Sequence, residues 1–340
     1  MSSPSPLVAV LLGGPSPEHE VSIATGERVL ASLPASRFTA APVFIDPMAR
    51  WFFPPLPYPP GKPWREGLSA ATAWRPGDGP MPWRPDACFI GLHGAYGEDG
   101  VVQAILDGLG VRYTGSGAAA SRLAMNKAAA KARYREAGLP VAPGIEIPVE
   151  SSAEEAASRV AQELSGPWVV KPRDGGSSVG VQMIDRREEL TAALARGLAL
   201  GPLLIEERIT GVELTCGVLD DFPGRVPRAL PVTEIRPRSD FFDYRAKYIA
   251  GASEELTPAP IGDPVASDAQ RLALAAHRAL DCTAYSRSDF ILRRGGGLVL
   301  LETNTLPGLT ATSLVPQEAA AAGIPYPALL TRLLQLALGA

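Results

Sequence analysis

The sequence predicts an α/β fold, and three stretches indicate it. The apolar run at residues 7–12 is followed by Gly13 and Gly14 and then by a helical pattern, the order of a strand, a tight turn and a helix. A second apolar run, residues 87–92, ends in a glycine-rich loop. Two further apolar runs flank residues 293–297, which predicts a β-hairpin because glycine accepts a positive φ without steric cost.

The composition is that of an ordinary soluble globular protein with two or three domains. The chain has 340 residues, of which 46% are hydrophobic and 20% charged, and its net charge is −4. Neither nucleic acid nor an anionic membrane is therefore expected as a partner. Cys88, Cys216 and Cys282 form neither a metal motif nor a disulfide framework, and no apolar run approaches a membrane span of about 18 residues. We expect a cytoplasmic protein.

The first helix is predicted to follow the strand at residues 7–12 after a short turn. Ser16 is a candidate N-cap, Pro17 suits the first helical position, and the helix would continue past Val29. Glu18 lies in the first turn, where it is either a ligand-binding residue or simply an acid favoured by the helix dipole. The Gly-x-Gly-x-x-Gly fingerprint is absent, so a dinucleotide is not supported.

A proline-rich stretch and a polar loop follow. Residues 46–85 show little periodicity and are predicted to be an irregular surface excursion of the first domain. The buried strand at 87–92 leads into His93, with Glu98 and Asp99 close behind. This loop is placed to meet a ligand, although it could equally be solvated, and its acids could cap the helix that begins after it.

The middle of the chain reads as a linker, a helix and further strands. Residues 113–117 are the predicted linker and residues 121–137 an alanine-rich helix. A strand at 168–170 enters a loop rich in glycine and serine that begins with Lys171, and the strand at 181–184 follows. Such a loop can fold over phosphates, with the lysine supplying charge; a glycine-rich hairpin turn is the alternative.

Residues 203–209 form a short predicted strand whose backbone can pair with a planar base. Its acids, Glu206 and Glu207, can take an amino group or ribose hydroxyls, or can simply lie on the surface. Residues 239–248 interleave aromatic and charged side chains, which suggests a loop that closes on a ligand. Amphipathic helices are predicted at residues 265–280 and 327–338.

The hairpin at residues 287–304 brings polar side chains together. Folding it about its turn places Asp289 opposite Glu302, Arg287 opposite Asn304, and Ile291 opposite Leu300. Opposed carboxylates repel each other, and a hard divalent cation such as Mg²⁺ removes that repulsion. A solvated, charged hairpin face is the alternative. The metal site is favoured because both acids lie in apolar strands and not in the turn.

Taken together, the motifs resemble D-alanine–D-alanine ligase, a family of ATP-grasp enzymes. They occur in the family's order: His-Gly at 93–94, Gly-Glu-Asp-Gly at 97–100, Tyr-Thr-Gly-Ser at 113–116, Met-Asn-Lys at 125–127, Lys-Pro at 171–172, Gly-Ser-Ser-Val-Gly at 176–180, Tyr-Arg-Ala-Lys-Tyr at 244–248, Arg-Ser-Asp at 287–289 and Glu-Thr-Asn-Thr-Leu-Pro-Gly at 302–308. The resemblance covers nearly the whole chain except the proline-rich stretch.

The resemblance implies a three-domain ATP-grasp architecture. Residues 1–118 would form an N-terminal Rossmann-like domain, residues 119–210 the central subdomain, and residues 211–340 the C-terminal subdomain with the metal and substrate sites. ATP would lie between the central and C-terminal sheets.

The family pattern also assigns ligand-binding residues. Two Mg²⁺ ions, or Mn²⁺ in their place, would be held by Asp289, Glu302 and Asn304. The nucleotide would be bound by Lys127, Lys171, Ser178 and Lys247 at the phosphates, Glu206 at the adenine, Glu213 at the ribose, and Glu207 and Ile209 beside them. Glu18 would hold the ammonium of the first D-alanine and would be linked through Ser177 to Tyr248, with His93 near the same substrate. Arg287 and the Gly308 N–H would stabilise the tetrahedral oxyanion. Ser313 and Leu314 would bind the carboxylate of the second D-alanine.

The implied reaction is ATP-dependent synthesis of D-alanyl-D-alanine through an acyl phosphate, for peptidoglycan, by a homodimer. A relative that joins D-alanine to D-lactate, D-serine or another amino acid is the nearest alternative, and a nucleotide-binding regulatory protein is a more distant one. Tyr248 favours the dipeptide. The sequence departs from the family pattern at Asn126, at Arg208 and at Ala311 with Thr312, and the last of these touches the second-substrate pocket.

Overall fold

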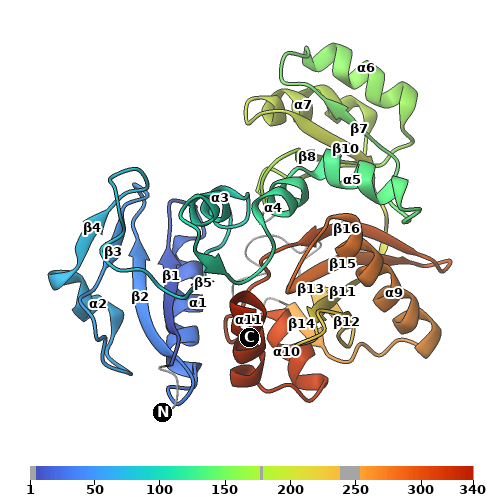
Figure 1. Ribbon diagram of the computed structural model, residues 1–340. Coiled ribbons are helices and arrows are strands. Elements are labelled where there is room, and N and C mark those ends of the chain that lie inside the picture. Colours follow the sequence, from blue (N-terminus) through green and yellow to red (C-terminus); the bar gives the residue numbers. More distant parts are fainter. Residues whose placement is uncertain (1–4, 177–178, 238–252, 340) are drawn as a thin grey trace.

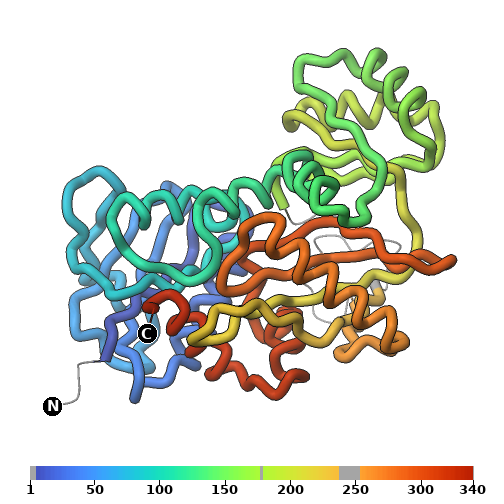
Figure 2. Tube along the Cα trace, turned by 45° about the vertical axis from the view of Figure 1, so that its right-hand side comes forward, coloured from blue at the N-terminus to red at the C-terminus, as the bar shows by residue number. Residues whose placement is uncertain are grey.

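The computed structural model describes residues 5–176, 179–237 and 253–339, and in it the chain forms three β-sheets with helices packed around them. The first sheet occupies one side of the molecule, and the central sheet lies above the C-terminal sheet on the other side (Figure 1). In the turned view of Figure 2 the central part stands out from the rest of the chain. The predicted α/β class is confirmed.

The first sheet has the strand order β4-β3-β2-β1-β5-β6, and β2, β1, β5 and β6 are parallel. Gly26 of the first helix packs directly on Leu12 of the central strand, where an added Cβ would lie 2.5 Å from the leucine Cβ. The elements are β1 (Leu7–Gly13), α1 (His19–Ser32), β2 (Thr39–Ile45), β3 (Trp51–Phe53), α2 (Trp64–Gly67), the 3₁₀ helix η1 (Leu68–Ala70), β4 (Thr72–Trp74), β5 (Ala87–Ile90), α3 (Val101–Gly108) and β6 (Arg112–Tyr113).

Helix α1 begins at His19, so the prediction that Ser16 caps it and that Pro17 opens it is wrong by two residues. The Ser16 hydroxyl accepts the N–H of Glu18 at 2.9 Å and donates to the carbonyl of His93 at 2.7 Å. The serine therefore ties the start of the helix to the loop after β5.

The prediction that residues 46–85 form an irregular surface excursion is also wrong. Strands β3 and β4 extend the first sheet at its edge, and Trp51, Phe53 and Trp74 are buried there. The rings of Trp51 and Trp74 lie edge to face with centroids 5.6 Å apart, and the Trp51 indole donates a hydrogen bond to the Tyr96 hydroxyl at 2.9 Å. Strands of three residues are too short to give a periodic pattern, so the sequence did not predict them.

The central sheet is antiparallel in the order β7-β10-β8-β9. The predicted helix at 121–137 is two helices, because Asn126 has an extended ψ of 98° and its side chain caps the second one by accepting the Ala129 N–H at 2.9 Å. The elements are α4 (Ala118–Met125), α5 (Lys127–Glu136), β7 (Gly144–Ile147), α6 (Ala153–Glu163), β8 (Trp168–Pro172), β9 (Gln182–Ile184), η2 (Arg187–Glu189), α7 (Leu190–Leu198) and β10 (Leu203–Glu207).

The C-terminal sheet has the order β14-β13-β11-β15-β16, with β12 paired to β11. The amphipathic helices predicted at residues 265–280 and 327–338 are confirmed as α9 and α11. The predicted loop at residues 239–248 lies outside the described residues. The elements are β11 (Gly211–Asp220), β12 (Pro227–Ala229), β13 (Thr233–Pro237), β14 (Ser253–Leu256), α9 (Asp263–Ala279), β15 (Tyr285–Arg293), β16 (Leu298–Asn304), α10 (Leu314–Ala321) and α11 (Tyr326–Leu338).

The three cysteines are free and buried, as the absence of a disulfide pattern predicts. Within the described ranges, every helix is too short or too polar to cross a lipid bilayer. The domain boundaries at residues 118 and 210 stay predictions.

Trp51→Ala tests whether the β3–β4 edge is an integral part of the first domain. Removing the buried ring leaves a cavity and takes away the hydrogen bond to the Tyr96 hydroxyl, so we expect the free energy of unfolding to fall by about 3–5 kcal/mol. Urea unfolding followed by far-UV circular dichroism measures it. Met48→Ala, at an exposed side chain beside the same strand, should change stability by less than about 0.5 kcal/mol. Equal effects of the two substitutions would contradict the assignment.

Candidate functional site

The β15–β16 hairpin holds the acids predicted to bind metal. Asp289 lies opposite Glu302 and Arg287 lies opposite Asn304, as the sequence predicts. The expected pairing of Ile291 with Leu300 is wrong by one residue, because the register shifts between Asp289 and Phe290 and Leu300 pairs with the phenylalanine. The ladder therefore contains a bulge next to the two acids.

Arg287 takes part in this patch directly. Its Nε and Nη2 atoms each donate to one carboxylate oxygen of Asp289 at 2.8 Å, and Thr215 donates to the same carboxylate at 2.6 Å. Burial alone would lower the pKa of the Arg287 guanidinium, but the charge and hydrogen bonds of Asp289 raise that pKa above its usual value. In this structure, then, a guanidinium offsets the repulsion between the two carboxylates.

The donor set of the hairpin fits a hard divalent cation. The register places Asp289 opposite Glu302, and Asn304 two residues further along β16, so two carboxylates and an amide lie on one face of the hairpin. Among the described residues no group of three or more His, Cys, Asp or Glu side chains is arranged to hold a metal. A cation here would thus need further oxygen ligands from phosphates and water, which is how Mg²⁺ is usually bound in nucleotide sites.

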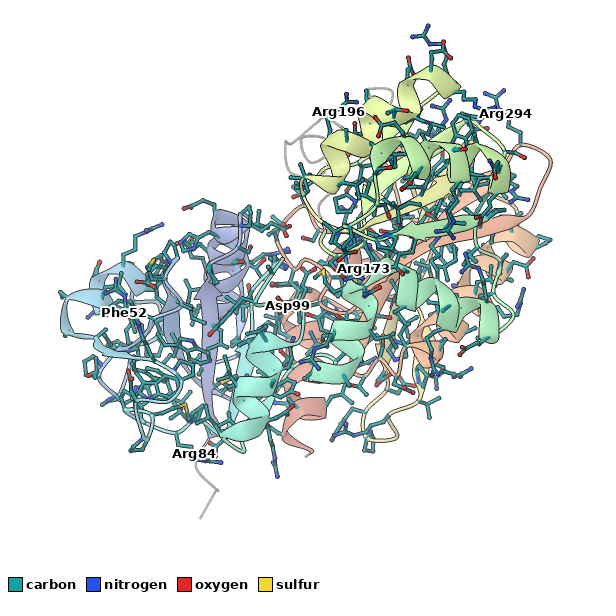
Figure 3. The ribbon with its side chains drawn as sticks, turned by 90° about the horizontal axis from the view of Figure 1, so that it is seen from above. Phe52, Arg84, Asp99, Arg173, Arg196 and Arg294 are labelled. Carbon is teal, nitrogen blue, oxygen red and sulfur yellow. The ribbon has the colours of Figure 1, made fainter. Side chains whose placement is uncertain are left out.

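A cavity of about 110 Å³ joins the hairpin to the other parts of the chain. Asp99 of the first part and Arg173 of the central part both lie toward the middle of the view in Figure 3, where the three parts meet. The predicted site residues that line the cavity are Glu18, His93, Lys127, Arg287, Glu302, Asn304, Gly308, Ser313 and Leu314.

Glu18 and His93 form one wall of the cavity. Glu18 immediately precedes α1, and an added Cβ at Gly94, which has a positive φ of +69°, would lie 2.5 Å from the Glu18 carboxylate. A glycine is required there because the loop and the carboxylate approach so closely. The ring of His93 is held by Thr25 at 2.8 Å and faces Glu98 at 3.4 Å.

The loop between β16 and α10 lines another part of the cavity. An added Cβ at Gly308 would lie 2.7 Å from the Ser313 hydroxyl, which also accepts the Thr310 N–H at 2.9 Å. Helix α10 starts at the next residue, Leu314, so its first N–H groups are near the cavity. Arg28 of α1 donates to the carbonyls of Leu309 and Thr310 and thereby fixes this loop; nothing in the sequence marked this arginine.

A second group of charges lies between the central and C-terminal sheets. The Glu206 carboxylate is buried and bound by two lysines, Lys171 at 2.5 Å and Lys131 at 2.8 Å. Burial opposes ionisation of Glu206, but the two lysines lower its pKa to about 2. The sequence analysis missed Lys131, although it lies one helical turn after Lys127 on the same face of α5.

The remaining predicted residues lie away from the cavity or outside the described ranges. Glu207 accepts the Ser165 N–H at 2.9 Å, and Glu213 lies on β11 opposite Ile291. Arg208, one of the departures from the family pattern, is ion-paired with Asp185 at 2.7 Å. Ile209 follows β10 and does not line the cavity, and the residues outside the described ranges are Ser177, Ser178, Lys247 and Tyr248. Lys127, in contrast, lines the cavity, and its side chain donates to the carbonyl of Gly175.

Comparison with known proteins gives concordant matches. Residues 7–116 match the family model of the D-ala D-ala ligase N-terminus, and residues 134–335 match that of the C-terminus. Among curated relatives, D-alanine–D-alanine ligases from Syntrophobacter fumaroxidans and Leptospira biflexa are 41% and 38% identical, covering 99% and 97% of this chain and 99% and 98% of their own lengths. The VanG D-Ala:D-Ser ligase structure from Enterococcus faecalis superposes with a TM-score of 0.86 at 28% identity, covering 98% of this chain and 99% of that one.

Glu206→Gln tests the two-lysine site. The substitution leaves Lys131 and Lys171 without a balancing charge, so we expect the free energy of unfolding at pH 7 to fall by about 3–5 kcal/mol. The folded pKa of Glu206 lies below its unfolded value. Its contribution is therefore complete above about pH 4.5 and is lost as the pH falls toward about 2.

Urea unfolding of wild type and variant between pH 7 and pH 3 measures this, and the stability difference should shrink toward the acid end. Glu207→Gln on the same strand is the matched control, with an expected loss below about 1.5 kcal/mol. A loss for Glu206→Gln no larger than the control, or one independent of pH, would contradict the two-lysine site.

Proposed function

The chain belongs to the D-alanine–D-alanine ligase family, and we propose that it uses ATP to join two D-alanines into D-alanyl-D-alanine for peptidoglycan synthesis. One observation carries the proposal. A carboxylate suited to an ammonium group, a guanidinium and the start of a helix share one cavity with Glu302 and Asn304 of the hairpin. The cavity therefore offers a position for each charged group of two amino acids and a phosphate.

The reaction has two steps in this proposal. The carboxylate of the first D-alanine attacks the γ-phosphorus of ATP, the bond to ADP breaks, and an acyl phosphate forms. The amine of the second D-alanine then attacks the carbonyl carbon, the C–N bond forms, and phosphate leaves with the bridging oxygen and takes up the proton that the nitrogen releases. The acyl phosphate reacts readily with water, so the site must exclude water while both steps proceed.

The residues of the cavity suit these steps. Glu18 would bind the ammonium of the first D-alanine, in a wall that His93 and Gly94 close behind it. Arg287 and the N–H of Gly308 would stabilise the oxyanion of the tetrahedral intermediate, which bears developing negative charge. Ser313 and Leu314, at the start of α10, would receive the carboxylate of the second D-alanine.

The phosphates and cations belong to the same proposal. Asp289, Glu302 and Asn304 would hold two Mg²⁺ ions, and such ions neutralise the charge of the transferred phosphoryl group. Lys127 and Lys171 would bind phosphate oxygens, with the Lys171 side chain 12% exposed beside Glu206. The adenine and ribose positions follow the family pattern at Glu206, Glu207, Ile209 and Glu213. The family pattern adds Ser178 and Lys247 at the phosphates, and Ser177 and Tyr248 beside Glu18; these four residues lie outside the described ranges.

D-Serine is the alternative second substrate. One solved structure similar to this chain is named as a D-Ala:D-Ser ligase, and Thr312 beside Ser313 lines the cavity where the family commonly has histidine.

The proposal also includes a homodimer in the cytoplasm. The cytoplasmic location is supported by the use of ATP and by three free cysteines.

The proposal is tested with ATP, Mg²⁺ and D-alanine, alone and with D-serine or D-lactate added. We expect one phosphate for each D-alanyl-D-alanine. We also expect a kcat/KM for D-alanine as second substrate at least about tenfold above that for D-serine, equivalent to ~1.4 kcal/mol of transition-state binding. Phosphate and product are counted in the same reaction. A mixed product as the main outcome would establish the alternative, and nucleotide binding without any product would contradict the enzymatic function.

A further inference from the structure

Lys131 is a buried lysine for which the proposed mechanism has no role. It lies on α5, its side chain is 1% exposed, and burial lowers its pKa to about 8 although Glu206 acts in the opposite direction. Burying a cation is costly unless it is paired and hydrogen-bonded. Lys131 is therefore expected to have contacts that compensate for its burial.

The first contact is with the nucleotide side of the site. Lys131 Nζ lies 2.8 Å from Glu206 Oε1, and Lys171 Nζ lies 2.5 Å from the other oxygen, Oε2. The two lysines thus bind one carboxylate from two directions. Lys171 is partly exposed, whereas Lys131 is buried. Lys131 therefore fixes the Glu206 carboxylate to which Lys171 is also bound.

The second contact is with the hairpin. Lys131 Nζ donates to the carbonyl of Leu300 in β16 at 3.0 Å, and the Leu300 N–H donates to the carbonyl of Pro140 at 2.8 Å. Both backbone groups of Leu300 are therefore bonded to partners outside the hairpin. Leu300 is the last residue before the bulge, since Phe290 pairs with it while Asp289 pairs with Glu302.

The bulge decides where Glu302 points. In a regular strand Leu300 and Glu302, two residues apart, would share a face, and Leu300 is in the core with Phe290. The extra residue, Leu301, moves Glu302 to the other face, opposite Asp289. The hydrogen bonds to Leu300 hold the strand at the point where this change of face occurs.

Helix α5 makes the connection rigid. Ala130 and Tyr134, on either side of Lys131, are buried in the same core as Leu300 and Phe290. The backbone of α5 is therefore fixed to the C-terminal sheet, while the Lys131 ammonium reaches Glu206 in the central sheet.

We propose that Lys131 is a positioning residue that couples the nucleotide site at Glu206 and Lys171 to the cation-binding face of the β15–β16 hairpin. The inference rests on the proposed function for the identity of the ligands, MgADP and MgATP. It predicts that loss of the lysine weakens nucleotide binding and also raises the Mg²⁺ concentration which that binding requires.

The test measures MgADP binding by calorimetry over a range of Mg²⁺ concentrations. We expect Lys131→Met to weaken MgADP binding about ten- to a hundredfold, the range for losing a hydrogen bond to a charged group. We also expect a higher Mg²⁺ midpoint, and a raised KM for ATP with the KM for D-alanine near its wild-type value. Lys131→Arg, which keeps the charge, should recover part of the affinity.

Arg133→Met is the matched control. Arg133 is a half-exposed cation on the same helix, and it also contacts the C-terminal part, where its Nε donates to the Ala279 carbonyl at 3.2 Å. We expect wild-type binding of MgADP. Similar losses for the two substitutions would mean that the contact between α5 and the C-terminal sheet matters rather than Lys131, and would overturn the inference.

Lys131→Gln keeps the test decisive if the methionine variant does not fold, which far-UV circular dichroism monitors. It retains a donor but has no charge for Glu206, and we expect weakened MgADP binding. Wild-type affinity in a folded variant without the charge overturns the inference, and weaker binding with an unchanged Mg²⁺ midpoint overturns the link to the hairpin. If wild type forms no dipeptide while Lys131→Met loses MgADP, the proposed function fails and this inference stands.

Discussion

The opposition of Asp289 and Glu302 across the β15–β16 hairpin is the constraint on which the site depends. Like charges directly opposite each other destabilise a strand pair, so this register needs compensation. Arg287 and Thr215 supply part of it by binding Asp289, and the bonds to Leu300 hold the bulge that directs Glu302 to the same face. A divalent cation bound on this face, as we propose, would add to that compensation.

Residues from parts of the chain around all three sheets adjoin the candidate site. The first sheet contributes Glu18 and His93 from strand ends, and the C-terminal sheet contributes the hairpin and the loop to α10. The central sheet contributes Glu206 and Lys171. A site at the meeting point of separate parts can close around its ligands and exclude water, which an acyl phosphate requires.

The sequence was sufficient where local pattern decides the structure. The hairpin pairing of Asp289 with Glu302 follows from two apolar runs around a glycine turn, and the motifs at His93, Lys127, Arg287 and residues 302–308 contribute residues to one cavity. It was insufficient where distant contacts decide. Leu300, next to the bulge, is hydrogen-bonded to Lys131 and Pro140, which are far from it in sequence, and strand β3, which contains Trp51, is too short to show a period.

We propose that the paired carboxylates of Asp289 and Glu302 hold divalent cations together with the nucleotide. Counting bound Mn²⁺ by electron paramagnetic resonance, with and without ADP, in wild type and in Glu302→Gln tests this proposal. The prediction is two ions per wild-type chain in the presence of ADP and fewer in the variant, with both proteins folded, because Glu302 is proposed to be a ligand shared by the ions. Equal numbers of tightly bound ions in the two proteins would contradict it.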